Sequence, residues 1–287
     1  MILSDKWKDY ELIDAGDGEK LERWGKYLLR RPEPQAIWPI KDSGGRWEKI
    51  HAHYHRSESG GGKWEYKTSI PEKWIIKYGN LSFYIEPTGF KHTGLFPEQA
   101  SNWDWIEDII KNSERKINVL NLFAYTGGAT VAAAHAGADV CHVDAAKGMV
   151  SRAKENLNLS GLSDRHVRFI VDDVVKFVKR EIRRGNKYDG IIMDPPSYGR
   201  GPKGELWKIE DELYGLIELC MEVMSNKPLF FLVNSYTSSI SPTVIKNILL
   251  MTVKKKYGGK VVSDELGLPV TSTGLVLPCG ITARWYI

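Results

Sequence analysis

The sequence has no long hydrophobic run and contains few cysteines. No stretch of about eighteen apolar residues occurs in its 287 residues. The first residues, MILSDKWKDYELID, are charged where a secretory signal would be apolar. The three cysteines, Cys141, Cys220 and Cys279, are far apart and in no metal-ligand spacing. These absences predict a cytoplasmic protein with free thiols, no membrane partner and no zinc site.

Positive and negative charges are also nearly equal in number. The net charge is +4 with a pI of about 8.7, a mild basic excess that permits contact with nucleic acid without requiring it. The hydrophobic fraction of 42% is sufficient for a sizeable core. A chain of 287 residues is long for one ordinary domain, so we expect one large domain and a smaller one.

The character of the sequence changes near residue 116. Before it, tryptophans, glycines and prolines crowd short segments that are typical of strands and turns. We therefore predict that residues 1–90 form a small β-rich domain that recognises the substrate, with a second domain over 91–287. Beyond residue 116, β-type apolar runs alternate with helical stretches, which predicts an α/β fold with a doubly wound, mostly parallel sheet. The predicted strands cover 116–124, 138–144, 166–173, 188–194, 228–236, 260–268 and 275–287, and the predicted helices 128–137, 146–160, 174–184, 209–225 and 241–255.

Sheets of this kind bind ligands at the carboxyl ends of their strands. At the first such end, AYTGGATV places Gly127 in a turn where backbone can approach a ligand closely, although a plain tight turn has the same sequence. At the second, Asp144 ends an apolar strand, where a carboxylate can bind the two hydroxyls of a ribose or cap the next helix. At the third, Asp172 or Asp173 can meet the amino group of an adenine while Val174 packs on its ring, or can cap a helix.

Phosphate-binding motifs are missing at these turns. AYTGGATV lacks the G-x-G-x-x-G spacing of dinucleotide-binding proteins, and no Walker lysine follows. The pattern therefore favours a nucleoside without phosphates, and S-adenosylmethionine is the common one.

The fourth strand end carries IIMDPPSYGRG, in which two prolines end the strand. A rigid prolyl carbonyl beside Asp194 can accept hydrogen bonds from an amino group, while Tyr198 offers a ring for stacking. Such a loop directs a nitrogen lone pair toward a methyl donor.

Together these residues resemble the class I S-adenosylmethionine-dependent methyltransferases. KHTGLFPEQASNW at 91–103, with the stretch that follows from residue 119, is similar to the bacterial enzymes grouped with the large-subunit ribosomal RNA cytosine-C5 methyltransferases. The resemblance implies a Rossmann-like methyltransferase domain over 91–287. It implies that a turn contacts the methionine part of S-adenosylmethionine, that Asp144 with Ala145 contacts the ribose, and that Asp173 or Asp172 contacts the adenine. The residues of that turn are Phe123, Ala124, Tyr125, Thr126 and Gly127.

The resemblance also implies an acceptor site and a covering segment. Asp194, Pro195, Pro196 and Tyr198 would be the catalytic residues around the target base, with Asp194 also near the cofactor. Gln99 and Asn102 lie in a segment that family members fold over the cofactor.

One departure concerns the cysteine that attacks C6 of cytosine in the C5 enzymes. The matching stretch after the fifth strand, FLVNSYTSSIS, contains Asn234, Ser235 and Tyr236 but no thiol. Because the three cysteines lie in predicted strands or a helix, we interpret them as core residues. We therefore predict methylation at a base nitrogen of RNA, with ribosomal RNA as the expected substrate. A protein side chain, a small molecule or a non-catalytic binding role are the alternatives.

Two further patterns are interpreted as structural rather than functional. HAHYH places His51, His53 and His55 on one face of a predicted strand, but no acid or cysteine lies at a suitable spacing, so the sequence predicts no metal site. The tryptophans of the first ninety residues are more typical of core than of base-stacking platforms. They are Trp24, Trp38, Trp47, Trp64 and Trp74.

Overall fold

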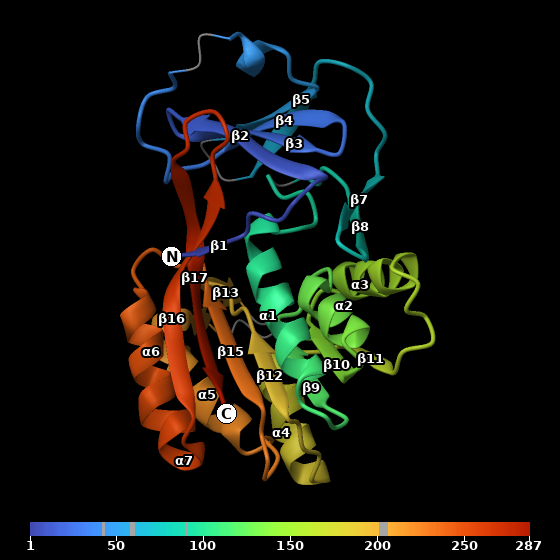
Figure 1. Ribbon diagram of the computed structural model, residues 1–287, viewed down its shortest axis with the longest axis vertical. Helices are drawn as coiled ribbons and strands as arrows, with labels where there is room; N and C mark the ends of the chain where they lie inside the picture. The colour runs from blue at the N-terminus through green and yellow to red at the C-terminus, as the bar shows by residue number, and fades with distance from the viewer. Residues whose placement is uncertain (42–43, 58–60, 90, 201–205) are drawn as a thin grey trace. The chain divides into compact units, whose positions relative to one another are not determined.

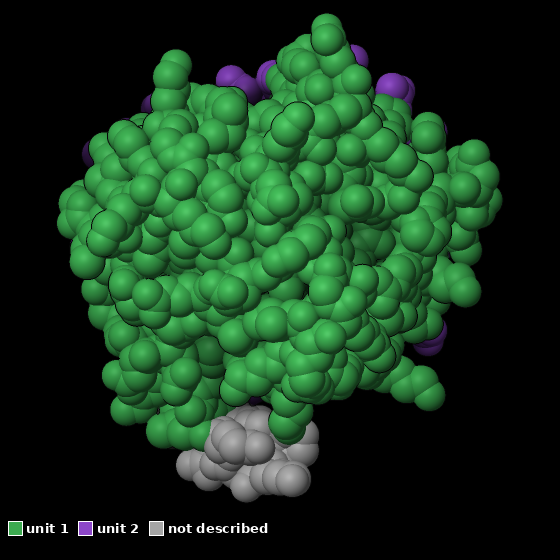
Figure 2. All heavy atoms as spheres, turned by 90° about the horizontal axis from the view of Figure 1, so that it is seen from below, with its two compact units in different colours: residues 1, 102–266, 280–287 green, residues 2–101, 267–279 purple. Residues whose placement is uncertain are grey.

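The computed structural model describes residues 1–41, 44–57, 61–89, 91–200 and 206–287, and its contacts divide into two compact units (Figures 1 and 2). The first unit comprises residues 1, 102–266 and 280–287, and the second comprises 2–101 and 267–279. These units differ from the contiguous ranges 1–90 and 91–287, which stay a prediction about domains. The difference arises because residues 91–101 and the segment 267–279 both belong to the second unit.

A large sheet has most of its strands in the first unit. The eight-stranded sheet has the order β1-β16-β17-β15-β12-β9-β10-β11 (Figure 1). Its strands are β1 (Ile2–Leu3), β9 (Asn118–Leu122), β10 (Asp139–Asp144), β11 (Val167–Val171), β12 (Gly190–Met193), β15 (Phe230–Ser235), β16 (Lys260–Pro269) and β17 (Val276–Tyr286). The five strands from β15 to β11 are parallel, and β17 is antiparallel to β15. The predicted doubly wound, mostly parallel sheet is therefore confirmed.

Helices cover both faces of this sheet (Figure 1). They are α1 (Ala100–Lys111), α2 (Gly128–His135), α3 (Lys147–Leu159), α4 (Val174–Arg184), α5 (Ile209–Met221), α6 (Pro242–Leu249), the π-helical turn η3 (Leu250–Lys254) and α7 (Lys255–Tyr257). Apolar side chains of α4, α5 and α6, such as Phe177, Ile217 and Ile245, form one core cluster with Leu120 and Ile191 of the sheet. The central strands are apolar on both faces because helices bury both. The sequence predicted α2 to α6 and η3, whereas α1 was not predicted and only the first residue of α7 lies in a predicted helix.

The second unit contains the predicted β-rich part of the chain. A five-stranded sheet has the order β2-β3-β4-β5-β6, and β7 pairs with β8. The strands are β2 (Tyr10–Gly16), β3 (Glu19–Trp24), β4 (Tyr27–Pro32), β5 (Ala52–Arg56), β6 (Gly62–Tyr66), β7 (Trp74–Tyr78) and β8 (Leu81–Ile85), with 3-10 turns η1 (Arg46–Glu48) and η2 (Pro97–Gln99).

Tryptophans of the second unit serve its structure. Trp24 and Trp47 are buried. The indole N–H of Trp38 donates to the Ala15 carbonyl at 2.6 Å, and that of Trp64 to the Thr88 carbonyl at 2.8 Å. Buried or hydrogen-bonded rings of this kind support the core interpretation over the base-stacking one.

A buried ion pair lies in the same unit. The guanidinium of Arg31 donates to both carboxylate oxygens of Glu22 at 2.6 and 2.8 Å, and the hydroxyl of Tyr10 donates to Glu22 at 2.8 Å. Burial alone would raise the pKa of Glu22, but the charges of Arg31 and Lys20 and the hydrogen bonds from Arg31 and Tyr10 together outweigh it and lower this pKa to about 2. The pair is therefore ionised over the physiological range.

In the part of the chain that the structure describes, no helix is long and apolar enough to cross a lipid bilayer.

Candidate active site

The carboxyl ends of four parallel strands meet in one row of the first unit. Four residues are in register across the sheet, namely Val233, Met193, Leu122 and Val143. The residues that follow them are Asn234, Asp194, Phe123 and Asp144. Because parallel strands end at the same edge, these four residues lie at the carboxyl edge of the sheet, and three of them, Asn234, Asp194 and Asp144, are polar. This edge is where an open α/β sheet binds its ligand.

The turn after β9 has an unusual backbone. Phe123 and Tyr125 have φ values of 54° and 49°, and Gly127 has 84°. Left-handed conformations at residues other than glycine cost free energy and concentrate at functional sites. At Gly127 a Cβ atom would lie 2.8 Å from the Cβ of Ala153, so glycine is required by space as well as by conformation. The N–H groups of Ala124 and Gly127 donate to the carbonyls of Val143 and Ala124, so internal hydrogen bonds hold this backbone in place.

Asp144 connects this turn to the next loop. Its Oδ2 accepts a hydrogen bond from the backbone N–H of Tyr125 at 2.8 Å, and its Oδ1 accepts one from Ala146 at 2.8 Å. The N-cap residue of α3 is Ala146, so Asp144 does not cap that helix through the usual position. Each carboxylate oxygen has a second lone pair, which leaves room for the hydroxyls of a ribose. These residues therefore fit a nucleoside cofactor.

The pair Asp172 and Asp173 follows β11. Asp173 is the N-cap of α4 and accepts a hydrogen bond from the N–H of Lys176 at 2.8 Å. Helix capping was the alternative to adenine contact in the interpretation of the sequence. Asp172 accepts from the N–H of Asp173 at 2.9 Å and forms an ion pair with Arg180. Val174 is only 4% exposed and belongs to the core, so the protein itself already covers its side chain. Contact of either aspartate with an adenine stays a prediction.

The loop after β12 is held by two side-chain contacts. The indole N–H of Trp207 donates to the carbonyl of Pro196 at 2.6 Å. The hydroxyl of Thr237 donates to that of Ser197 at 2.6 Å. Pro195 is buried, and Asp194 is half-buried at the start of the loop. The prolines, the indole and the threonine together fix the direction in which the loop leaves the sheet.

Tyr198 is the first residue of a short hairpin beyond the prolines. The strand β13 (Tyr198–Arg200) pairs with β14 (Leu206–Lys208), and the Tyr198 side chain remains 51% exposed. The ring centroid of Trp207, a residue of β14, lies 5.7 Å from that of Phe123. Trp207 thus contacts both the turn after β9 and the loop after β12. Sequence reasoning missed Trp207, because nothing local distinguishes it from the other tryptophans.

Asn102 and Gln99, predicted to cover the cofactor, are both buried. In the first unit, the amide nitrogen of Asn102 donates to Asn234 at 2.9 Å, and its oxygen accepts from Nε of Arg284 at 2.9 Å. Burial lowers the pKa of Arg284 to about 10, which leaves it charged at neutral pH. This network ties α1 to β15 and β17. Gln99 lies in the second unit, in η2, and is 8% exposed.

The three thiols are poor nucleophiles. Cys141 is 2% exposed, and burial raises its pKa to about 11. Burial also raises the pKa of Cys220 and that of Cys279 well above the ordinary value. A nucleophilic cysteine needs the opposite shift, toward the thiolate. At the end of β15, the described residues Asn234 and Ser235 supply no thiol.

The sheet, the strained turn and the carboxylates at the carboxyl edge are those of a Rossmann-like domain that fits a nucleoside cofactor. The family model described as S-adenosylmethionine-dependent methyltransferase matches residues 28–219, and the chain belongs to this family. It is therefore an enzyme whose cofactor is S-adenosylmethionine, which confirms the resemblance seen in the sequence.

Known relatives agree with this assignment. The S-adenosylmethionine-dependent methyltransferase of Agrobacterium tumefaciens is 37% identical, with a TM-score of 0.93 over 99% of this chain and 92% of that one. The ribosomal RNA large subunit methyltransferase K/L of Shewanella frigidimarina is 36% identical over 50% of this chain and 20% of its own length. The ribosomal RNA large subunit methyltransferase K of Neisseria meningitidis is 24% identical over 78% of this chain and 65% of its own. The chain spans between 20% and 32% of the length of the first three curated relatives that it matches.

Proposed function

We propose that this enzyme methylates a base nitrogen of RNA, with ribosomal RNA as the substrate class. The observation that carries the proposal is the Asp194–Tyr198 loop, which follows the strand next to β9, together with the lack of a cysteine in the other neighbouring strand, β15. The names of the Shewanella and Neisseria relatives support RNA as the acceptor. The free cysteines support a reducing cytoplasm as the compartment.

For the cofactor, the proposed contacts follow the row of strand ends. The turn from Phe123 to Gly127 would hold the methionine part, and Asp144 with Ala145 the ribose. Asp172 or Asp173 would meet the adenine, and Asp194 would lie near the donor. Asn102 would act by holding α1 in place, since its amide already has protein partners.

S-adenosylmethionine, when bound, supplies a methyl group that its sulfonium already activates. The carboxylate of Asp194 and the carbonyl of Pro195 would accept hydrogen bonds from the acceptor's amino group and direct its lone pair. We assign Pro195 because the carbonyl of Pro196 already accepts from Trp207. The acceptor nitrogen so directed would gain the methyl group, S-adenosylhomocysteine would be the leaving group, and the nitrogen would lose its proton to solvent. Tyr198 would stack on the base.

The test is transfer of labelled methyl to total RNA, to protein extract and to a metabolite extract. Asp194→Ala should lower kcat for RNA by about 100-fold with little change in cofactor affinity, because the contact aligns the reacting pair. Tyr198→Ala should weaken acceptor binding by roughly 1 to 3 kcal/mol, whereas Tyr198→Phe should be mild because the ring remains. Asp164→Ala, an exposed turn residue of the same unit, is the control and should leave kcat unchanged.

Two outcomes would contradict the proposal. Label in protein or metabolites but not in RNA would show that the methyl acceptor is a protein side chain or a small molecule. Full turnover in folded Asp194→Ala would remove the loop from catalysis.

Replacing the cysteines distinguishes methyl transfer to nitrogen from methyl transfer to carbon. A variant with all three cysteines replaced by alanine should retain methyl transfer per folded molecule, because transfer to nitrogen needs no covalent adduct. A covalent complex between the wild-type chain and RNA that carries 5-fluorocytidine would instead show C5 chemistry.

A further inference from the structure

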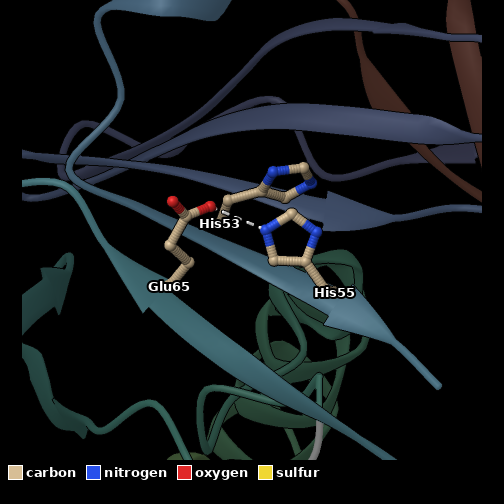
Figure 3. A group of neighbouring side chains, drawn as sticks. All are labelled: His53, His55 and Glu65. Atoms are coloured by element: carbon tan, nitrogen blue, oxygen red, sulfur yellow. Dashed lines mark hydrogen bonds and ion pairs between the residues drawn. The ribbon is translucent and has the colours of Figure 1, made fainter.

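Two histidines and a glutamate lie together on the five-stranded sheet of the second unit. His53 and His55 are two residues apart on β5, so their side chains leave the same face of the strand. Their ring centroids are 3.9 Å apart. Glu65 comes from the neighbouring strand β6, where it is the direct antiparallel partner of His53. Figure 3 shows the carboxylate of Glu65 beside both imidazole rings.

The geometry is close to that of a metal site. One potential ligand atom of each residue lies within 4.8 Å of those of the other two, and Nε2 of His55 is 2.8 Å from Oε2 of Glu65. Ligands of a tetrahedral ion with bonds of about 2.0–2.1 Å are roughly 3.3 Å apart, so small side-chain rotations are sufficient. Such rotations are cheap here, because the side chains of His55 and Glu65 are 44% and 45% exposed.

A fourth residue orients the less exposed histidine. Nε2 of His53 is 2.7 Å from Oε1 of Glu19, a residue of β3. With this nitrogen engaged by a carboxylate, the other ring nitrogen, Nδ1, is the one available to a metal. A carboxylate that holds the second nitrogen of a ligating histidine is the common support in protein metal sites.

We propose that His53, His55 and Glu65 form a binding site for a divalent transition metal ion such as Zn²⁺, with Glu19 as the residue that positions His53. Two imidazoles and a carboxylate suit Zn²⁺ and exclude a preference for Mg²⁺ or Ca²⁺, which take oxygen ligands. Three protein ligands leave a coordination position open to water. The sequence predicted no metal site for lack of an acid at a suitable spacing, and the acid comes from the facing strand.

The competing interpretation is a surface ion pair. Lys67 also contacts the carboxylate of Glu65, so the histidines and the glutamate could be ordinary exposed charges. The two interpretations differ in what each residue contributes. An ion pair needs two groups and no metal, whereas the metal site needs all three ligands at once.

The test is calorimetric titration of the full chain, without an affinity tag and after treatment with EDTA, with ZnCl₂. We expect one ion per chain, and a loss of affinity of at least about tenfold in each of the variants His55→Ala and Glu65→Gln, because each removes a ligand. Glu19→Gln should lower the affinity by about tenfold through the orientation of His53. MgCl₂ should give no binding at the same concentrations.

His166→Ala is the matched control. This exposed histidine of the first unit also pairs with a carboxylate, that of Asp139 at 3.2 Å, and its removal should leave Zn²⁺ affinity unchanged. Circular dichroism of each variant establishes that it is folded. Absence of Zn²⁺ binding by the wild-type chain, or wild-type affinity in either His55→Ala or Glu65→Gln, would overturn the proposal.

Discussion

Replacing Asp144 by alanine tests the residue that connects two turns of the candidate cofactor site. The change removes the acceptor of two backbone hydrogen bonds, from Tyr125 and from Ala146, each of 2.8 Å. Because the carboxylate is half-buried, we expect the two bonds together to stabilise the fold by about 1 to 2 kcal/mol. Loss of the charge-assisted contact with the ribose should cost about 1 to 3 kcal/mol of cofactor binding, or roughly 5- to 150-fold in Kd.

Two measurements on one preparation separate these effects. Calorimetry with S-adenosylmethionine gives Kd, and urea unfolding gives the free energy of unfolding. Asp139→Ala is the control, since Asp139 begins the same strand and forms an ion pair with Lys116 at 2.7 Å. It should lower stability slightly and leave Kd unchanged. Asp144→Asn keeps one acceptor oxygen and should lie between wild type and Asp144→Ala in both measurements.

The reasoning would be refuted by a folded Asp144→Ala variant that binds S-adenosylmethionine as tightly as wild type. A lower unfolding free energy with unchanged Kd would leave Asp144 as a loop support alone. An equal change of Kd in Asp139→Ala would show that the effect is not specific to this end of β10.

Two other substitutions follow from contacts in the structure. Trp207→Phe removes the hydrogen bond to Pro196 but keeps an aromatic ring, so kcat should fall about fivefold, the equivalent of one hydrogen bond, at unchanged cofactor Kd. An unchanged kcat would show that this bond does not position the loop. Glu22, paired with Arg31, has its pKa lowered from 4.5 to about 2, so its stabilising contribution is complete above pH 4.5 and is lost as pH falls toward 2. Urea unfolding of the wild type between pH 7 and 2 should show this loss of stability, roughly 3 kcal/mol. Glu22→Gln should be less stable than the wild type at pH 7 and should not show the loss. Parallel curves of unfolding free energy against pH for the two proteins would contradict the prediction.

Much of the first unit could be predicted because its signals are local. Apolar runs of strand length, bounded by a glycine turn after β9 and by two prolines after β12, mark where strands end. In a parallel sheet those ends share an edge, so Asp144 and Asp194 could be assigned to one site before any contact was known. The helix α1, ASNWDWIEDIIK, was not predicted, because only its first residues, ASNW, were interpreted, and those through the family resemblance alone.

What the sequence by itself determined is therefore the order of elements and the chemical groups at their ends, since both depend on residues close together in the chain. The tertiary structure decided which distant groups meet. Only folding brings Trp207 to the carbonyl of Pro196 and Arg284 to Asn102, and only the antiparallel pairing of β5 with β6 sets Glu65 beside His53. Such contacts depend on strand register and on helix packing, which many sequences satisfy with different residues, so no spacing along the chain announces them.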